Sequence, residues 1–277
     1  MSDLPLVTRF APSPNGPLHL GHAHSAIVSH DLAREAGGRF LLRIEDIDGP
    51  RSKPELADEF RRDLEWLGLE WEEVEKQSDR LDAYNYAAET LLDRGLLYRC
   101  NCTRRQIESL PPRIGRDGLK YPGSSRGQYS RRNADEGVAL RLDIDRAMDE
   151  VGALTWEDEL AGKQVADPRP FGDVVLVRKD LPSSYHLSVT TDDAHDGVSL
   201  VTRGMDLFDA THIHRVLQAL LGTQVPRWHH HKLVLDDNGE KLAKRRGSPS
   251  LSARREAGED GLMLAEQLRM QKFPLGT

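Results

Sequence analysis

The sequence predicts an α/β protein with a parallel sheet, an inserted smaller α+β subdomain and a short helical C-terminal tail. The first observation is that strand-like and helix-like patterns alternate over residues 6–67, and such alternation builds parallel sheets. The second is a change to short, turn-rich pieces from about residue 99. The third is that strand-like and helix-like runs return after residue 180, as expected if the middle segment interrupts one main domain.

The elements are predicted from hydrophobic periodicity and from the residues that end them. We expect strands at residues 6–11 and 39–44, and helices at residues 20–36, 53–67 and 80–94. After the insert we expect strands at residues 186–191 and 197–203 and a helix at residues 211–221. The predicted units are residues 1–98 and 181–247 for the two halves of the main domain, 99–180 for the insert and 248–277 for the tail.

Composition limits the possible partners. The 38 Lys and Arg residues against 45 Asp and Glu give a net charge of −7, so a phosphate-rich partner must be held by a local basic face. The chain starts without the pattern of a signal peptide, and no apolar stretch approaches the roughly 20 residues that cross a bilayer. We therefore expect a cytoplasmic protein without a membrane partner, and nothing predicts an obligate protein partner.

The strongest local signal is the run from Arg9 to His22, in which a strand breaks into a turn rich in Pro and Gly and a helix then begins with His19 and His22. A helix N-terminus attracts anions, and two imidazoles three residues apart can reach the same phosphate. Gly21 lets a base or ribose approach the backbone closely. A bare His-x-x-His pair is more often a surface feature. The turn before it favours a nucleotide triphosphate site.

A second signal lies far downstream, where a turn at residues 237–239 precedes the basic run Lys241-Leu-Ala-Lys-Arg245. A lysine on a loop can neutralise charge as an α-phosphate is attacked and pyrophosphate leaves. Alone, this run is typical of a solvated loop. Together with the first signal, it indicates a two-part nucleotide site.

These two runs resemble the HIGH and KMSKS signatures of class I aminoacyl-tRNA synthetases, although Ala243 replaces the usual serine. The resemblance is closest to glutamyl-tRNA synthetases and extends from about Val7 to Arg246. It rests on several separated segments in the right order: Arg9-Phe-Ala-Pro-Ser13, Leu42-Arg-Ile-Glu-Asp-Ile-Asp48, Trp66-Leu-Gly-Leu-Glu-Trp71 and Arg203-Gly-Met-Asp-Leu207. It implies a Rossmann-like nucleotide-binding catalytic domain that uses ATP with Mg²⁺.

The resemblance also implies the site residues. The expected glutamate-binding residues are Arg9, Phe10, Ala11, Pro12, Ser13, Glu45, Tyr185 and Arg203. The expected ATP-binding residues are His19, Gly21, His22, Lys241, Lys244 and Arg245, of which His19, His22 and Lys244 are expected to be catalytic. The chemistry fits glutamate, since arginines can each bind a carboxylate and a glutamate side chain can bind the α-ammonium.

Only residues 246–277 follow the second signature, which leaves no room for a domain that reads the anticodon. The chain therefore resembles the glutamyl-Q tRNA(Asp) synthetase family, which activates glutamate without tRNA and attaches it to queuosine in tRNA(Asp). The segment Asp46-Ile47-Asp48 and the Cys-x-Cys pair are similar to that family. The expected partners are L-glutamate, ATP and tRNA(Asp) carrying queuosine.

The resemblance implies a zinc site at Cys100, Cys102, Tyr121 and a fourth cysteine, but Ser125 stands at that fourth position. Serine is a poor zinc ligand because its hydroxyl does not readily ionise. Zinc therefore stays a possible cofactor, with one of its four expected ligands replaced by serine. The run His229-His-His231 receives no ligand role, since consecutive residues of a strand point to opposite faces.

Three alternatives stay open at this point. A truncated glutamyl-tRNA synthetase would charge the 3′ end of tRNA(Glu). A small-molecule adenylyltransferase with a HIGH-like turn would not need the glutamate residues. A non-catalytic RNA-binding relative would have lost part of the signature, whereas His19, His22 and Lys244 are all present.

Overall fold

The computed structural model describes residues 5–108, 114–115, 118–119, 121, 123–126, 137–234 and 249–270. The second predicted signature, with Lys241, Lys244 and Arg245, lies outside the described residues.

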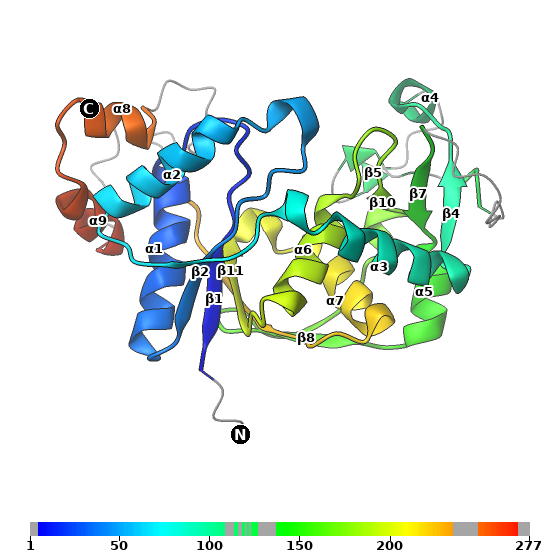
Figure 1. The fold of residues 1–277 in the computed structure, drawn as a ribbon. Helices are drawn as coiled ribbons and strands as arrows, with labels where there is room; N and C mark the ends of the chain where they lie inside the picture. Colours follow the sequence, from blue (N-terminus) through cyan, green and yellow to red (C-terminus); the bar gives the residue numbers. More distant parts are fainter. Residues whose placement is uncertain are drawn as a thin grey trace.

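Two groups of strands lie side by side at the centre of the fold (Figure 1). In one group β2 pairs in parallel with both β1 and β3, and in the other β12 pairs in parallel with β11 and β8 while β9 closes the edge in antiparallel orientation. The backbone N–H of Ser199 donates to the carbonyl of Val7 at 3.0 Å, which places β1 beside β11. The strands are β1 (Val7–Phe10), β2 (Arg39–Leu42), β3 (Glu72–Glu73), β8 (Thr155–Asp158), β9 (Gly162–Val165), β11 (Leu200–Gly204) and β12 (Arg227–His231). The predicted parallel sheet is confirmed.

Helices from distant parts of the sequence pack on the strands and form two main hydrophobic clusters. The first cluster joins α1 (Leu20–Glu35) and α2 (Pro54–Trp66) to the sheet. The second packs α3 (Leu81–Asp93), α5 (Ile144–Val151), α6 (Tyr185–His195) and α7 (Ala210–Leu221) against one another. Both clusters consist mainly of Leu, Ile, Val and Ala side chains removed from water, which is the main stabilising contribution to such a fold.

The short tail forms two helices, α8 (Leu251–Glu256) and α9 (Gly261–Arg269), which lie beside α1 and α2 (Figure 1). The guanidinium of Arg269 pairs with Asp31 of α1 at 2.8 Å, and that of Arg255 pairs with Asp63 of α2 at 3.2 Å. Leu251, among others, is completely buried in the first cluster. The tail is thus part of the main core.

The middle segment contains an antiparallel sheet in the order β10–β7–β4, with short pieces around it. Its elements are β4 (Leu97–Cys100), α4 (Arg104–Glu108), β5 (Ile114–Gly115), β6 (Gly118–Leu119), β7 (Ala139–Leu142) and β10 (Val175–Val177). Although β8 also falls in the range predicted to form the insert, it pairs with β12 next to the main sheet. This pairing brings Asp158 close to the site described below.

One predicted strand is wrong. Residues 186–191 belong to helix α6. Val189, Thr190 and Thr191 are β-branched and favour strands on average. In α6, however, the hydroxyls of Thr190 and Thr191 donate to the carbonyls four residues earlier, at 2.8 and 2.9 Å, so the helix satisfies their polar groups while it packs on α3 and α7.

Candidate active site

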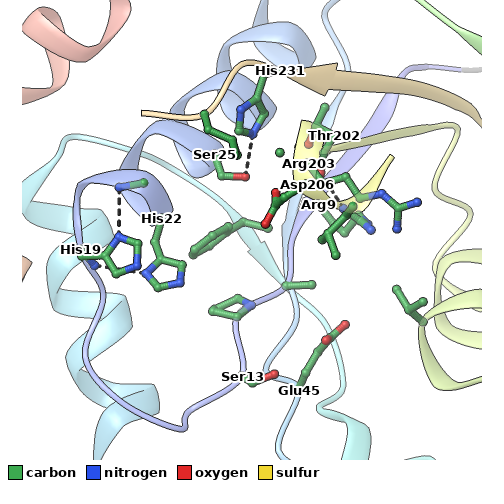
Figure 2. Close-up of a pocket in the computed structure, with 18 of the residues that line it drawn as sticks. Arg9, Ser13, His19, His22, Ser25, Glu45, Thr202, Arg203, Asp206 and His231 are labelled. Atoms are coloured by element: carbon green, nitrogen blue, oxygen red, sulfur yellow. Dashed lines mark hydrogen bonds between the residues drawn. The ribbon is translucent and has the colours of Figure 1, made fainter. Parts of the chain in front are cut away.

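A cavity of about 460 Å³ lies at the carboxyl ends of β1, β2 and β11. In α/β proteins this edge is where side chains that follow different strands converge on a ligand. Figure 2 shows a histidine end, with His19 and His22, and an arginine end, with Arg9 and Arg203, while Glu45 lies to one side. The cavity therefore offers differently charged surfaces to a single ligand.

The structure brings most of the predicted site residues to this cavity. All eight predicted glutamate-binding residues line it, namely Arg9, Phe10, Ala11, Pro12, Ser13, Glu45, Tyr185 and Arg203. Three predicted ATP-binding residues, His19, Gly21 and His22, line it as well. Their proximity follows from the fold, whereas their roles stay predictions.

The two histidines cap helix α1 reciprocally. The Nδ1 atom of His19 accepts from the backbone N–H of Gly21 at 3.1 Å, and the Nδ1 atom of His22 accepts from the backbone N–H of His19 at 3.1 Å. In a neutral imidazole whose Nδ1 is an acceptor, the proton is on Nε2. Both rings can thus present an Nε2–H donor at a helix N-terminus, where anions are stabilised.

Arg9 reaches the cavity as the partner of a carboxylate. Its Nε and Nη2 atoms lie 3.0 and 3.2 Å from the two carboxylate oxygens of Asp193 in α6, and its Nη1 donates to the carbonyl of Thr202 at 3.0 Å. Asp193 also accepts from Arg43 at 2.9 Å. Burial alone would raise the pKa of Asp193, but the guanidinium groups of Arg9 and Arg43 hold it below its usual value.

Glu45 is buried between charges of both signs. Its side chain is 8% exposed, and Arg43 donates to its Oε1 atom at 3.3 Å. Burial raises the pKa of Glu45 to about 7, opposed by Arg43 and supported by the nearby carboxylate of Asp192. A carboxyl group in this state gains from a ligand that brings a positive charge.

Arg203, at the end of β11, is a buried cation held by neutral groups. Its Nε donates to Nε2 of His230 at 3.1 Å, its Nη1 donates to the hydroxyl of Tyr185 at 3.0 Å and to Nδ1 of His214 at 3.2 Å, and its Nη2 donates to the hydroxyl of Thr211 at 2.6 Å. In the described part of the chain, it makes no ion pair with a carboxylate. Burial lowers the pKa of Arg203, because the buried guanidinium loses the solvation of its charge.

The three consecutive histidines of β12 have separate partners. His229 contacts Glu159 at 3.1 Å, His230 contacts Asp158 at 2.7 Å, and Nε2 of His231 contacts the hydroxyl of Ser25 at 3.0 Å. They do not converge on one point, which agrees with the alternation of side chains along a strand.

Several lining residues were missed from the sequence, namely Ser25, Thr202, Gly204, Asp206 and His231. Ser25 had a usable signal, because it lies three residues after His22 on the same helix, and Gly204 and Asp206 lie in the segment Arg203-Gly-Met-Asp-Leu207 that carries the family resemblance. A Cβ added at Gly204 would lie 2.5 Å from Oδ1 of Asp206 and 2.7 Å from Cδ2 of Leu233, so a larger residue here would have to displace the ends of these two side chains.

The residues predicted as possible zinc ligands also come together. In this group, which we call the cysteine cluster, the Sγ of Cys102 lies 3.5 Å from the hydroxyl of Tyr121 and 3.7 Å from that of Ser125, and the two hydroxyls are 2.9 Å apart. Cys100 ends β4 beside them, completely buried. The guanidinium of Arg141 lies 4.1 Å over the Tyr121 ring.

The donors of the cysteine cluster do not fit a structural zinc site. Two ligand atoms of a tetrahedral zinc with bonds near 2.3 Å are about 3.7 Å apart, so the position of Ser125 is suitable while its hydroxyl is not. Tyr121 and Ser125 instead satisfy each other by hydrogen bonds. Across the described ranges, no three His, Cys, Asp or Glu side chains are placed to hold a metal ion.

Comparison with known proteins identifies the family of the chain. The family model of the class I tRNA synthetase (E and Q) catalytic domain matches residues 5–274, and the chain belongs to this family. A Glutamyl-Q tRNA(Asp) synthetase from Rhodobacter capsulatus is 51% identical over 91% of this chain and 96% of that protein. A Glutamate–tRNA ligase 1 from Paracoccus denitrificans is 37% identical over 91% of this chain but only 57% of that ligase.

A solved glutamate tRNA ligase from Elizabethkingia meningosepticum, in complex with its amino acid, superposes with a TM-score of 0.78 at 26% identity. The match covers 96% of this chain and 60% of that chain, so this protein spans less than two thirds of the solved ligase. Family membership makes the chain a ligase of the glutamyl-tRNA synthetase type that uses ATP.

No helix among the described residues is both long and apolar enough to cross a membrane.

Proposed function

We propose that this protein activates L-glutamate with ATP, without tRNA, and transfers the resulting glutamyl group to queuosine in tRNA(Asp). The observation that carries the proposal is the composition of one cavity, which combines the cations Arg9 and Arg203, the buried carboxyl group of Glu45 and the capped histidine pair. Free glutamate has two carboxylates and one ammonium, so these charges are complementary.

The two ends of the cavity orient the amino acid. The carboxylate that is activated must meet the ATP phosphates, which the helix N-terminus at His19 and His22 favours. The side-chain carboxylate then lies at the arginine end, where Arg203 has no anionic partner among the described residues, and the α-ammonium approaches Glu45 (Figure 2). This orientation leaves each charged group of the substrate with a partner of opposite charge or a donor.

In the first step, an oxygen of the α-carboxylate attacks the α-phosphorus of ATP. The bond from the α-phosphorus to the oxygen that bridges the α- and β-phosphates breaks, and pyrophosphate leaves. The Mg²⁺ ion enters with ATP as part of the substrate and leaves with pyrophosphate. The Nε2–H groups of His19 and His22 and the ammonium of Lys244 stabilise the charge on the transferring phosphate. The protein itself forms no covalent bond.

In the second step, a hydroxyl of the queuosine cyclopentenediol attacks the activated carbonyl, AMP leaves and an ester forms. Support for this acceptor comes from the relatives, because the similarity to the R. capsulatus protein extends over nearly all of that protein. The segment Asp46-Ile47-Asp48 also resembles that family. The rival acceptor is the 3′ end of tRNA(Glu), the substrate class of the glutamate–tRNA ligases.

Two measurements test the proposal. Glutamate-dependent ATP–pyrophosphate exchange without RNA tests the first step, and exchange that needs tRNA or proceeds without glutamate contradicts it. Transfer of labelled glutamate is then compared among queuosine-containing tRNA(Asp), tRNA(Asp) without queuosine and tRNA(Glu). We expect label only on the first, and transfer confined to tRNA(Glu) contradicts the proposed acceptor.

A further inference from the structure

Among the buried arginines around the cavity, Arg203 differs in the charge of its neighbours. Arg9 pairs with Asp193, and Arg43 pairs with Asp193 and Asp196 at 2.9 and 2.8 Å. Among the described residues, Arg203 has imidazole and hydroxyl acceptors and no carboxylate partner, although its side chain is similarly buried. These hydrogen bonds therefore fix the orientation of the Arg203 guanidinium without neutralising its charge.

The contact with His230 depends on Asp158. The parallel pairing of β8 with β12 places Asp158 opposite Trp228, and its Oδ2 atom accepts from the backbone N–H of His230 at 3.2 Å and lies 2.7 Å from Nδ1 of that ring. A carboxylate at Nδ1 fixes the proton on that nitrogen. The other nitrogen, Nε2, is then an acceptor, and it lies 3.1 Å from the Nε–H of Arg203.

A second imidazole pair holds another edge of the guanidinium. Nη1 of Arg203 donates to Nδ1 of His214, so the proton of His214 is on Nε2, which lies 3.1 Å from Nδ1 of His186. Burial, with the charge of Arg203, lowers the pKa of His186 to about 4 and that of His214 well below its usual value, so these rings stay neutral acceptors. Burial also lowers the pKa of His230 to about 4.

We propose that Asp158 and His230 are positioning residues that orient Arg203 while leaving its charge available for the side-chain carboxylate of a dicarboxylic amino acid. A carboxylate in direct contact with Arg203 would provide stronger orientation, but it would compete with the substrate for the same donors and charge. A neutral imidazole avoids that competition, and Asp158 fixes its tautomer from the far side. The inference rests on the proposed glutamate site and adds two residues that do not line the cavity.

The test compares variants of one strand by glutamate-dependent pyrophosphate exchange. His230→Leu removes the acceptor, and we expect the KM for glutamate to rise roughly 10- to 100-fold while the KM for ATP stays within about twofold. His230→Gln can still accept from Arg203 and donate to Asp158, and we expect it to restore most of the affinity. His229→Leu is the matched control, because His229 contacts Glu159 outside the cavity.

Asp158→Asn provides an independent variant. Its remaining oxygen can still accept from the N–H groups of Leu160 and Ala161, as the carboxylate does, while its NH₂ group faces the ring of His230 and the backbone N–H of the same residue loses its acceptor. The ring then presents an N–H towards Arg203, so we expect the same selective rise in the KM for glutamate. This variant carries the test if His230→Leu does not fold.

A purely structural role lowers kcat or the melting temperature of these variants and leaves the KM for glutamate within about twofold of wild type. That result overturns the inference. The two proposals fail separately, because wild-type protein without glutamate-dependent exchange contradicts the proposed function. Calorimetric binding of L-glutamate to the same variants still decides the role of Asp158 and His230.

Discussion

The amino-acid cavity and the cysteine cluster both gather polar residues, but in the described part of the chain they differ in how far the charges of these residues are neutralised. Among the described residues, the buried guanidinium of Arg203 has neutral acceptors and no carboxylate partner, and at Glu45 burial raises the pKa of the carboxyl group to about 7. In the cysteine cluster, Tyr121 and Ser125 satisfy each other through hydrogen bonds. Since buried unneutralised charge costs free energy, it persists where a ligand provides compensation.

This difference separates recognition from folding. Residues of the cavity are held by partners that do not neutralise their charge, so a charged ligand can provide the neutralisation. Residues of the cysteine cluster are held by one another, so no ligand is needed for their satisfaction. The predictions below test this contrast from the largest expected effect to the smallest.

Arg203→Gln should have the largest effect on activity. Loss of one partner from a buried charge pair costs roughly 4 kcal/mol, and we therefore expect kcat/KM for glutamate to fall about 1,000-fold in pyrophosphate exchange. The comparison variant is Arg9→Gln, which, unlike Arg203→Gln, removes an ionic partner of Asp193. Calorimetric melting should therefore show a larger loss of stability for Arg9→Gln than for Arg203→Gln. Equal losses of stability would remove the distinction between the two arginines.

Lys244→Ala tests whether the cavity divides binding from chemistry. Because Lys244 is proposed to stabilise charge on the transferring phosphate, its loss should lower kcat for exchange roughly 100-fold. The affinity for glutamate, measured by calorimetry without ATP, should be nearly unchanged. An unchanged exchange rate removes this lysine from the mechanism.

Much of the cavity could be predicted from the sequence because its residues follow strands or begin a helix. Arg9 and Arg203 lie in strands, and Glu45 follows β2, so the parallel sheet alone brings them to one edge. His19 could be placed at a helix N-terminus from the turn that precedes it. Local patterns and the resemblance to a family were sufficient for these positions.

The partners that hold these residues could not be predicted. Asp193 lies 184 residues from Arg9, in helix α6, of which residues 186–191 were wrongly predicted to form a strand. Asp158 reaches His230 only because β8, from the middle segment, pairs with β12. Contacts of this kind depend on the packing of distant elements, and one sequence contains no periodic signal for them.

Glu45 should make the affinity for glutamate depend on pH. Below its pKa of about 7 the carboxyl group of the empty cavity is protonated, so binding of the α-ammonium requires loss of that proton. The KM for glutamate should therefore rise as pH falls through about 7, by up to about tenfold per pH unit. Exchange kinetics from pH 5.5 to 8.5 measure this, and Glu45→Gln should have a higher KM without the dependence. A wild-type KM that is constant over this range would contradict the assigned role of Glu45.

Ser125→Cys should have the smallest effect on activity and provides a test of the cysteine cluster. The hydroxyl of Ser125 lies 3.7 Å from the Sγ of Cys102, the separation that two ligands of one zinc require, so a thiolate there completes the donor set. We expect the variant to bind one zinc ion per chain by elemental analysis and to melt at a higher temperature with the metal than after chelation. Its kcat/KM should stay within about twofold of wild type, since Ser125 does not line the cavity. Wild-type protein that retains one zinc per chain after dialysis against a chelator would show that the Ser125 hydroxyl is an adequate ligand, and the contrast between the two regions would then be wrong.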